Sequence, residues 1–208
     1  MNEAKIRLSP EEMGLLSNAE WILTKNRILE KGKTMLASIA DIQRVVMDNL
    51  QPELPTEISK VPAKISRGEN YKGLPYLILD QPRYFSKGEV FAIRTMLWWG
   101  RMFSITLHLT GNYKINYEKQ VAENFELWKS NVFYLCIHEE EWEHHFEENN
   151  YLPVASFKAA DFSKQLQQRK FIKLAKQVPL DKWDEMDVIA LNTFSLIMQG
   201  VGYQLPNR

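Results

Sequence analysis

The stretch VFAIRTMLWWGRMFSITLHL, residues 90–109, decides the fold that we expect of this chain. Its second half alternates apolar residues with serine, threonine and histidine, which is the period of a β-strand with one buried face. Its first half is apolar except for Arg94 and Thr95. Because Gly100 lies between the halves, we predict two long strands that pair as an antiparallel hairpin.

The length of the hairpin loop determines which side chains lie beside one another across the two strands. A two-residue loop at Trp99–Gly100 places the polar face of the second strand beside Thr95, whereas a three-residue loop places it beside Arg94. Both loop lengths stay open at this point. That polar face consists of Ser104, Thr106 and His108.

Helical patterns precede the hairpin. Ser9, Pro10 and Glu12 form the signature of a capped helix start. Apolar residues then recur at helical spacing over residues 15–46, with Gly32 in the middle. We predict two helices that end and begin at Gly32, with one long helix through Gly32 as the alternative.

Further helices are predicted at residues 115–131, 160–178 and 181–200 from the same kind of spacing. Strands and helices therefore do not alternate along the chain. This order predicts an α+β protein with an N-terminal helical pair, a central and mostly antiparallel sheet, and C-terminal helices packed on that sheet.

The chain length of 208 residues suits a single domain. Prolines cluster at the end of the N-terminal helices and predict an extended linker there. The expected parts of the domain 1–208 are a helical segment at 1–51, a linker at 52–62, a sheet-rich core at 63–157 and C-terminal helices at 158–208.

The composition excludes several classes of protein. Hydrophobic residues make up 45% of the chain and the formal net charge is zero, so we expect a folded protein with no overall field that attracts nucleic acid or an anionic membrane. A single cysteine rules out an intrachain disulfide and fits a reducing compartment. Because no signal-peptide pattern and no long uncharged stretch occurs, we expect a cytoplasmic protein with no membrane partner.

A second informative stretch is VFYLCIHEEEWEHHFEENNY, residues 132–151, which contains three of the four histidines and the only cysteine. Its first six residues are apolar and predict another strand. Two interpretations of residues 139–148 stay open. A helix would place Glu141 and His145 on one face, four positions apart, whereas a strand would place them on a solvated face.

The helical interpretation predicts a site for a divalent transition metal. Imidazole and carboxylate groups are the ligands of such sites, which need three or four of them within about 2.0–2.2 Å of the ion. The spacing differs from the His-Glu-x-x-His signature of zinc proteases, and a solvated acidic face explains the same residues. The candidate metal ligands are His138, Glu141, His145 and His108.

Arg94 is the basis of a different hypothesis, a ligand-binding site at the hairpin. An arginine within an apolar strand needs a carboxylate or an anionic ligand, and its planar guanidinium binds either in a bidentate manner. An internal ion pair with Asp80 or Glu69 is the structural alternative. The candidate ligand-binding residues are Arg94, Trp98, Trp99, Arg101 and His108.

The leading hypothesis for function is therefore a cofactor-free module that binds a small ligand or another protein. The apolar faces of the N-terminal helices have to be buried, either as core or as a helical hairpin packed on the sheet, and a homodimer interface is the functional alternative. One alternative is a metal-dependent enzyme that uses the histidine and glutamate cluster. A weaker alternative is a nucleic-acid binder that uses the basic helix predicted at 160–178. No phosphate-binding loop and no Gly-x-Ser-x-Gly motif assigns a catalytic residue.

Overall fold

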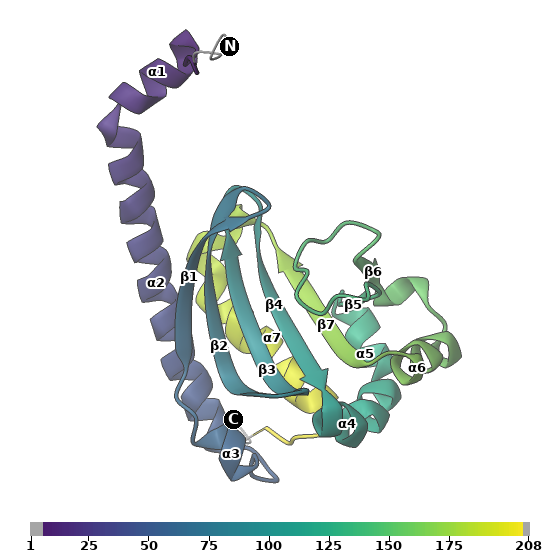
Figure 1. The fold of residues 1–208 in the computed structure, drawn as a ribbon. Helices are drawn as coiled ribbons and strands as arrows, with labels where there is room; N and C mark the ends of the chain where they lie inside the picture. The colour runs from purple at the N-terminus through teal and green to yellow at the C-terminus, as the bar shows by residue number, and fades with distance from the viewer. Residues whose placement is uncertain (1–5, 206–208) are drawn as a thin grey trace.

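A computed structural model describes residues 6–205, which form an α+β fold around one antiparallel sheet (Figure 1). Within these residues the sheet has seven strands in the order β1-β2-β3-β4-β7-β5-β6. The strands are β1 (Lys64–Tyr71), β2 (Leu74–Ser86), β3 (Glu89–Trp98), β4 (Met102–Thr110), β5 (Tyr134–Cys136), β6 (Tyr151–Pro153) and β7 (Phe171–Val178).

Helices precede, interrupt and follow the strands, as the α+β prediction requires. The α-helices are α1 (Pro10–Ser17), α2 (Ala19–Met47), α3 (Thr56–Ser59), α4 (Gly111–Glu123), α5 (Phe125–Ser130), α6 (Ala159–Gln168) and α7 (Met186–Gly200). Two short 3₁₀ helices are η1 (Val154–Ser156) and η2 (Leu180–Glu185). No helix of the described residues is long and apolar enough to cross a membrane.

The main hydrophobic core joins the sheet to the helices α2 and α7, which lie on one face of it (Figure 1), and also includes buried residues of α4, α5 and α6. Alternate residues of each middle strand supply the sheet's part of that core because successive side chains point to opposite faces. In β4 these are Phe103, Ile105, Leu107 and Leu109, none of which is exposed. The opposite face of the same strands receives the polar residues.

The hairpin of β3 and β4 has the three-residue loop. Trp98 pairs with Met102, and residues 99–101 connect them. Arg94 is therefore directly opposite Thr106, and its other neighbour across the sheet is Asp80 in β2. The register thus aligns an arginine, a carboxylate and a row of hydroxyl and imidazole groups on one face.

The prediction of two helices divided at Gly32 is wrong, because α2 continues through that residue. A Cβ atom at Gly32 would lie 2.9 Å from Leu97 and 3.1 Å from Leu77, so the glycine lets the helix approach the sheet closely instead of ending it. The predicted helix start is confirmed, since Ser9 and Glu12 form a capping box before α1.

Three other predicted elements are corrected. Residues 139–148 form neither a helix nor a strand but an irregular loop. The basic helix predicted at 160–178 is α6 followed by β7, because the sheet's centre buries 171–175 completely and so overrides helical spacing. The helix predicted at 115–131 is divided at Asn124 into α4 and α5. The ends of the expected domain, 1–5 and 206–208, lie outside the described residues.

Gly200 provides a test of the packing between α7 and α5. A Cβ atom at this position would lie 2.0 Å from two ring atoms of Trp128, which is completely buried and donates its indole N–H to the carbonyl of Val121. We expect Gly200→Ala to lower the free energy of unfolding by about 1–3 kcal/mol in a urea titration, because the ring has no space to move into.

The matched control is Gly14→Ala in α1, where no atom lies within 4 Å of the added methyl group. This variant should unfold at the wild-type urea concentration or slightly above it, because alanine favours a helix. Equal stability of the two variants would contradict the packing described for α7.

Candidate functional site

The candidate site lies on the sheet face opposite α2 and α7, which we call the covered face. Asp80, Arg94 and Thr106 form one row across β2, β3 and β4, and His108 and Lys173 are neighbours in the next row across β4 and β7. Each of these residues except Arg94 is at most 5% exposed. Such a density of buried polar groups on a sheet is unusual unless a structural or functional site requires it.

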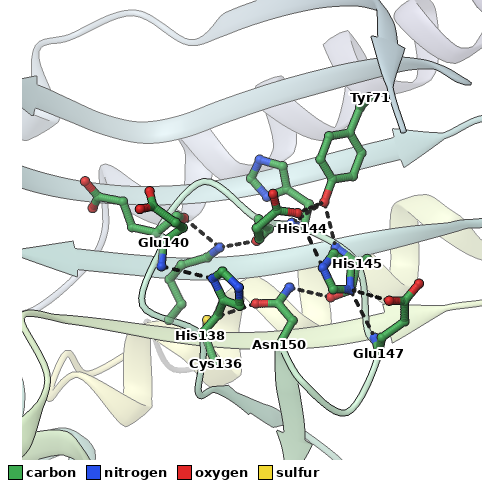
Figure 2. A network of polar contacts seen from close by, with 11 residues as sticks. Tyr71, Cys136, His138, Glu140, His144, His145, Glu147 and Asn150 are labelled. Carbon is green, nitrogen blue, oxygen red and sulfur yellow. Dashed lines mark hydrogen bonds and ion pairs between the residues drawn. The ribbon is translucent and has the colours of Figure 1, made fainter. Parts of the chain in front are cut away.

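Residues 137–150, the covering loop, lie across this face and carry all the glutamates and histidines of the second informative stretch. Tyr71 and Lys173 of the sheet bond to the loop's backbone, Asn150 bonds to the carbonyl of His145 within the loop, and Figure 2 shows the network. Trp142 of the loop also packs against Phe85 of β2 and His108 of β4. The loop is therefore held on the sheet by polar and aromatic contacts instead of by regular hydrogen-bonded structure.

Arg94 is fully engaged by groups of the protein itself. Its Nε and Nη2 donate to the two carboxylate oxygens of Asp80 at 2.7 and 3.0 Å, and its guanidinium lies over the ring of Trp142. Its Nη1 lies 3.3 Å from Nε2 of His144. Because arginine only donates, Nε2 must accept this bond, and His144 is therefore neutral. Burial and the nearby Lys173 and Arg94 charges lower the pKa of His144 well below its usual value, in agreement with that geometry.

Lys173 is the least compensated charge of the site. It is 1% exposed, and its Nζ donates to the backbone carbonyls of Glu141 and Glu143 at 2.8 and 2.6 Å. Among residues 6–205 no carboxylate forms an ion pair with it within 4.0 Å. Burial lowers the pKa of Lys173 to about 8, since an ammonium without a carboxylate partner is unstable in a dry environment.

His108 of β4 and Glu141 of the covering loop form a direct side-chain hydrogen bond. Their Nε2 and Oε2 atoms lie 2.8 Å apart. Burial lowers the pKa of His108, and the bond from His108 lowers the pKa of Glu141. Both shifts indicate a neutral imidazole that donates to an ionised carboxylate at neutral pH.

Tyr71 at the end of β1 holds the middle of the loop (Figure 2). Its hydroxyl accepts the backbone N–H groups of His144 and His145 at 2.7 and 3.1 Å and donates to Glu143 at 2.8 Å. Burial raises the pKa of Tyr71 to about 12, so the hydroxyl stays protonated over the physiological range. One neutral phenol thus fixes the backbone of the loop beside its two adjacent histidines.

The five candidate ligand-binding residues do not line one pocket. Arg94 and His108 lie beneath the covering loop, where Asp80 supplies the internal ion pair that the sequence offered as the structural alternative. Trp98 and Arg101 line a hollow of about 390 Å³ at the hairpin end of the loop, together with Lys72, His145 and Glu147. Trp99 packs against the main core and therefore lies apart from the other four.

The four candidate metal ligands are likewise divided. His108 and Glu141 meet, but the Nδ1 atom of His138 accepts the backbone N–H of Glu140. His145 is buried near Glu143 and Glu147 instead of near Glu141 (Figure 2). Within residues 6–205 no group of three histidine, cysteine, aspartate or glutamate side chains is placed to hold a metal ion.

Sequence reasoning missed Lys173, His144 and Tyr71 as members of the site. Lys173 lay in a predicted basic helix, although Phe171, Lys173 and Ala175 also alternate as one strand face. That alternation was the available signal for a strand. A lysine on its buried face, between Phe171 and Ala175, would have suggested a site, because lysine is rarely buried. No local pattern marks His144 or Tyr71, whose roles depend on contacts more than 70 residues apart.

Comparison of the chain with protein-family models, with curated proteins and with solved structures gives no match.

The pH dependence of stability tests the burial of Lys173. Its pKa is about 8 in the folded protein and about 10.4 in an unfolded chain. Between these values the unfolded state binds a proton that the folded state lacks, so folding should become more favourable as pH rises, by up to about 1.4 kcal/mol per pH unit. Urea titrations from pH 8 to 10 should show this rise in the wild type and not in Lys173→Met.

The control is Lys164→Met, which removes the same charge from an exposed position of α6. Its stability should follow the wild-type pH dependence. The difference between variants isolates Lys173, because the tyrosines that titrate above pH 10 are present in all three proteins. A Lys173→Met curve parallel to that of the wild type would contradict an uncompensated ammonium at this position.

Proposed function

We propose that the protein binds a small carboxylate or phosphate anion on the covered face and that the covering loop opens to admit it. The observation that carries this proposal is the Lys173 ammonium, which is buried and bonded to two carbonyls but to no carboxylate. A buried cation costs free energy unless an anion accompanies it. Buried lysines with lowered pKa values are also typical of functional sites.

The charges of the covered face favour an anion over a cation or a neutral ligand. Asp80 compensates Arg94, so that pair contributes no net charge. Removal of the covering loop would take away Glu141, Glu143 and the two carbonyls that Lys173 now uses. Lys173, His108 and the hydroxyl of Tyr71 would then be donors without acceptors, and an anion would satisfy them together.

The structure of the covering loop supports an opening motion. The loop has no internal helix or strand, and bonds to a few side chains of the sheet, together with the aromatic contacts of Trp142 and Phe146, hold it in place. A hollow flanks it at each end of the underlying strands, one of about 390 Å³ and the other of about 520 Å³. Loops of this kind, which lack buried backbone ladders, open at lower free energy than the sheets beneath them.

The hollow at the hairpin end has the more basic lining. Lys72 and Arg101 belong to it with one carboxylate, Glu147, whereas the other hollow has Glu139, Glu140 and Glu141 beside Lys114 and Lys170. The positive charges at the hairpin end would raise the local concentration of small anions near that edge of the loop. In this proposal Trp98 and Arg101 line an entrance to the anion site, and Arg94 and His108 form the floor of that site.

The other expectations have less support. A metal-dependent reaction would rest on the single pair of His108 and Glu141. The nucleic-acid hypothesis depended on a basic helix at 160–178. The second half of that segment is the strand β7, in which Lys173 is buried. A cytoplasmic location stays part of the proposal on the ground of composition and the single cysteine, which is free and buried.

Isothermal titration calorimetry with inorganic phosphate and with malonate tests the proposal. We expect saturable binding of at least one of these anions by the wild type at pH 7. Binding should move the pKa of Lys173 upward, because an adjacent anion favours the ammonium. At pH 8, where the lysine is half protonated, the heat should therefore depend on the ionisation enthalpy of the buffer and show proton uptake.

Lys173→Met should lose the binding, and Lys164→Met, with the same change of charge on α6, should keep it. Thermal unfolding gives a second readout, since an anion at 100 times its dissociation constant stabilises the folded state by about 2.7 kcal/mol. Equal responses of the wild type and Lys173→Met to both anions would contradict the proposal.

A further inference from the structure

A second surface, independent of the covered face, is formed by the N-terminal arm, which we define as residues 6–31. Figure 1 shows α1 and the first part of α2 extending beyond the end of the sheet. No side chain of α1 is buried, and the first buried residue of α2 is Leu29. The arm therefore lies almost entirely outside the hydrophobic core.

The arm exposes more large apolar side chains than we expect of a helix that faces only water. Leu16 is 71% exposed, Leu15 is 51% exposed and Trp21 is 44% exposed. The full set of exposed large apolar residues on the arm is Ile6, Leu8, Met13, Leu15, Leu16, Trp21, Ile22, Leu23 and Ile28. An eight-residue helix without tertiary packing is marginal in water, and apolar surfaces of this extent usually mark contacts with a partner.

The charges of the arm identify the partner that it fits. Residues 10–20 carry three glutamates and no basic residue, whereas residues 25–33 carry four basic residues and one glutamate. Two arms side by side in opposite directions would place the acidic part of each against the basic part of the other. Glu11 and Lys31 lie at equal distances along the chain from Trp21, so both pairs of a twofold arrangement can form at once.

A groove beside α2 provides the place for the second arm. It has a volume of about 730 Å³ and lies between α2 and Trp183 of η2. Leu23 and Trp183 are its apolar lining residues, and its charged ones are Arg27, Lys31 and Glu30, which sum to one positive charge. A helix that presents Leu15 and Leu16 to the apolar residues and Glu11 to the basic pair would match the groove in both hydrophobicity and net charge. The α1 helix of another copy has these residues.

We propose that two copies of the chain form a homodimer through antiparallel arms, with α1 of each copy in the groove between α2 and Trp183 of the other. Such a contact is isologous and closes at two subunits. A standard interface involves about 20–30 residues from each partner, which is the length of the arm with the groove. Lys31 and Glu11 have no ion-pair partner among residues 6–205, so both are available to a second copy.

Sedimentation velocity over a concentration series tests the homodimer. The wild type should reach twice the 24.4 kDa mass of the chain. Leu16→Glu should raise the dimer dissociation constant at least tenfold, because it places a charge in the apolar contact. Ile115→Glu, the same change at a 70% exposed position of α4, should leave the constant unchanged. Circular dichroism checks that both variants are folded.

A charge exchange separates pairing between copies from capture of some other partner. Glu11→Lys alone and Lys31→Glu alone should each weaken the dimer severalfold, and the double variant should recover wild-type association because both cross-pairs are restored in reverse. Both positions are exposed, so the fold should not change. A wild type that stays monomeric throughout the series, or a double variant weaker than either single variant, would overturn the proposal.

Discussion

The interaction on which the covered face depends is the pair of hydrogen bonds from Lys173 to the carbonyls of Glu141 and Glu143. They join the middle of β7, a central strand, to the middle of an irregular loop. The loop in turn brings Glu141 to His108 and His144 to Arg94. Without the lysine, two carbonyls beneath the loop would have no hydrogen-bond donor. Unpaired buried carbonyls destabilise the folded state and are rare in proteins.

The two faces of the sheet are stabilised in different ways. Apolar side chains of the strands pack against α2 and α7 on one face, where Gly32 and Gly200 allow close approach of helix to sheet and of helix to Trp128. On the covered face polar contacts join aromatic ones, and several of the polar contacts require a neutral histidine or tyrosine. Close packing resists opening of the first face, whereas the contacts of the second also depend on protonation.

The sequence predicted the α+β class, the central hairpin and the capped start of α1, because these follow from local periodicity and from side-chain chemistry within a few residues. It also offered Asp80 as the partner of Arg94, which the cross-strand register confirms. It did not predict β7, since burial at the centre of the sheet overrides the helical spacing of a basic segment. The strand alternation of Phe171, Lys173 and Ala175 was a local signal for the burial of Lys173, but its contacts with the loop and those of Tyr71 depend on tertiary structure.

The claim that the covering loop is a separate, openable element is tested most directly by native-state hydrogen exchange of its backbone amides. The N–H groups of His144 and His145, which bond to Tyr71, should exchange through a local opening of much lower free energy than that of the β4 amides. Phosphate should speed their exchange, because the anion binds the groups that hold the loop closed and so favours the open state. Exchange of these amides only with global unfolding, unaffected by phosphate, would contradict a loop that opens to admit a ligand.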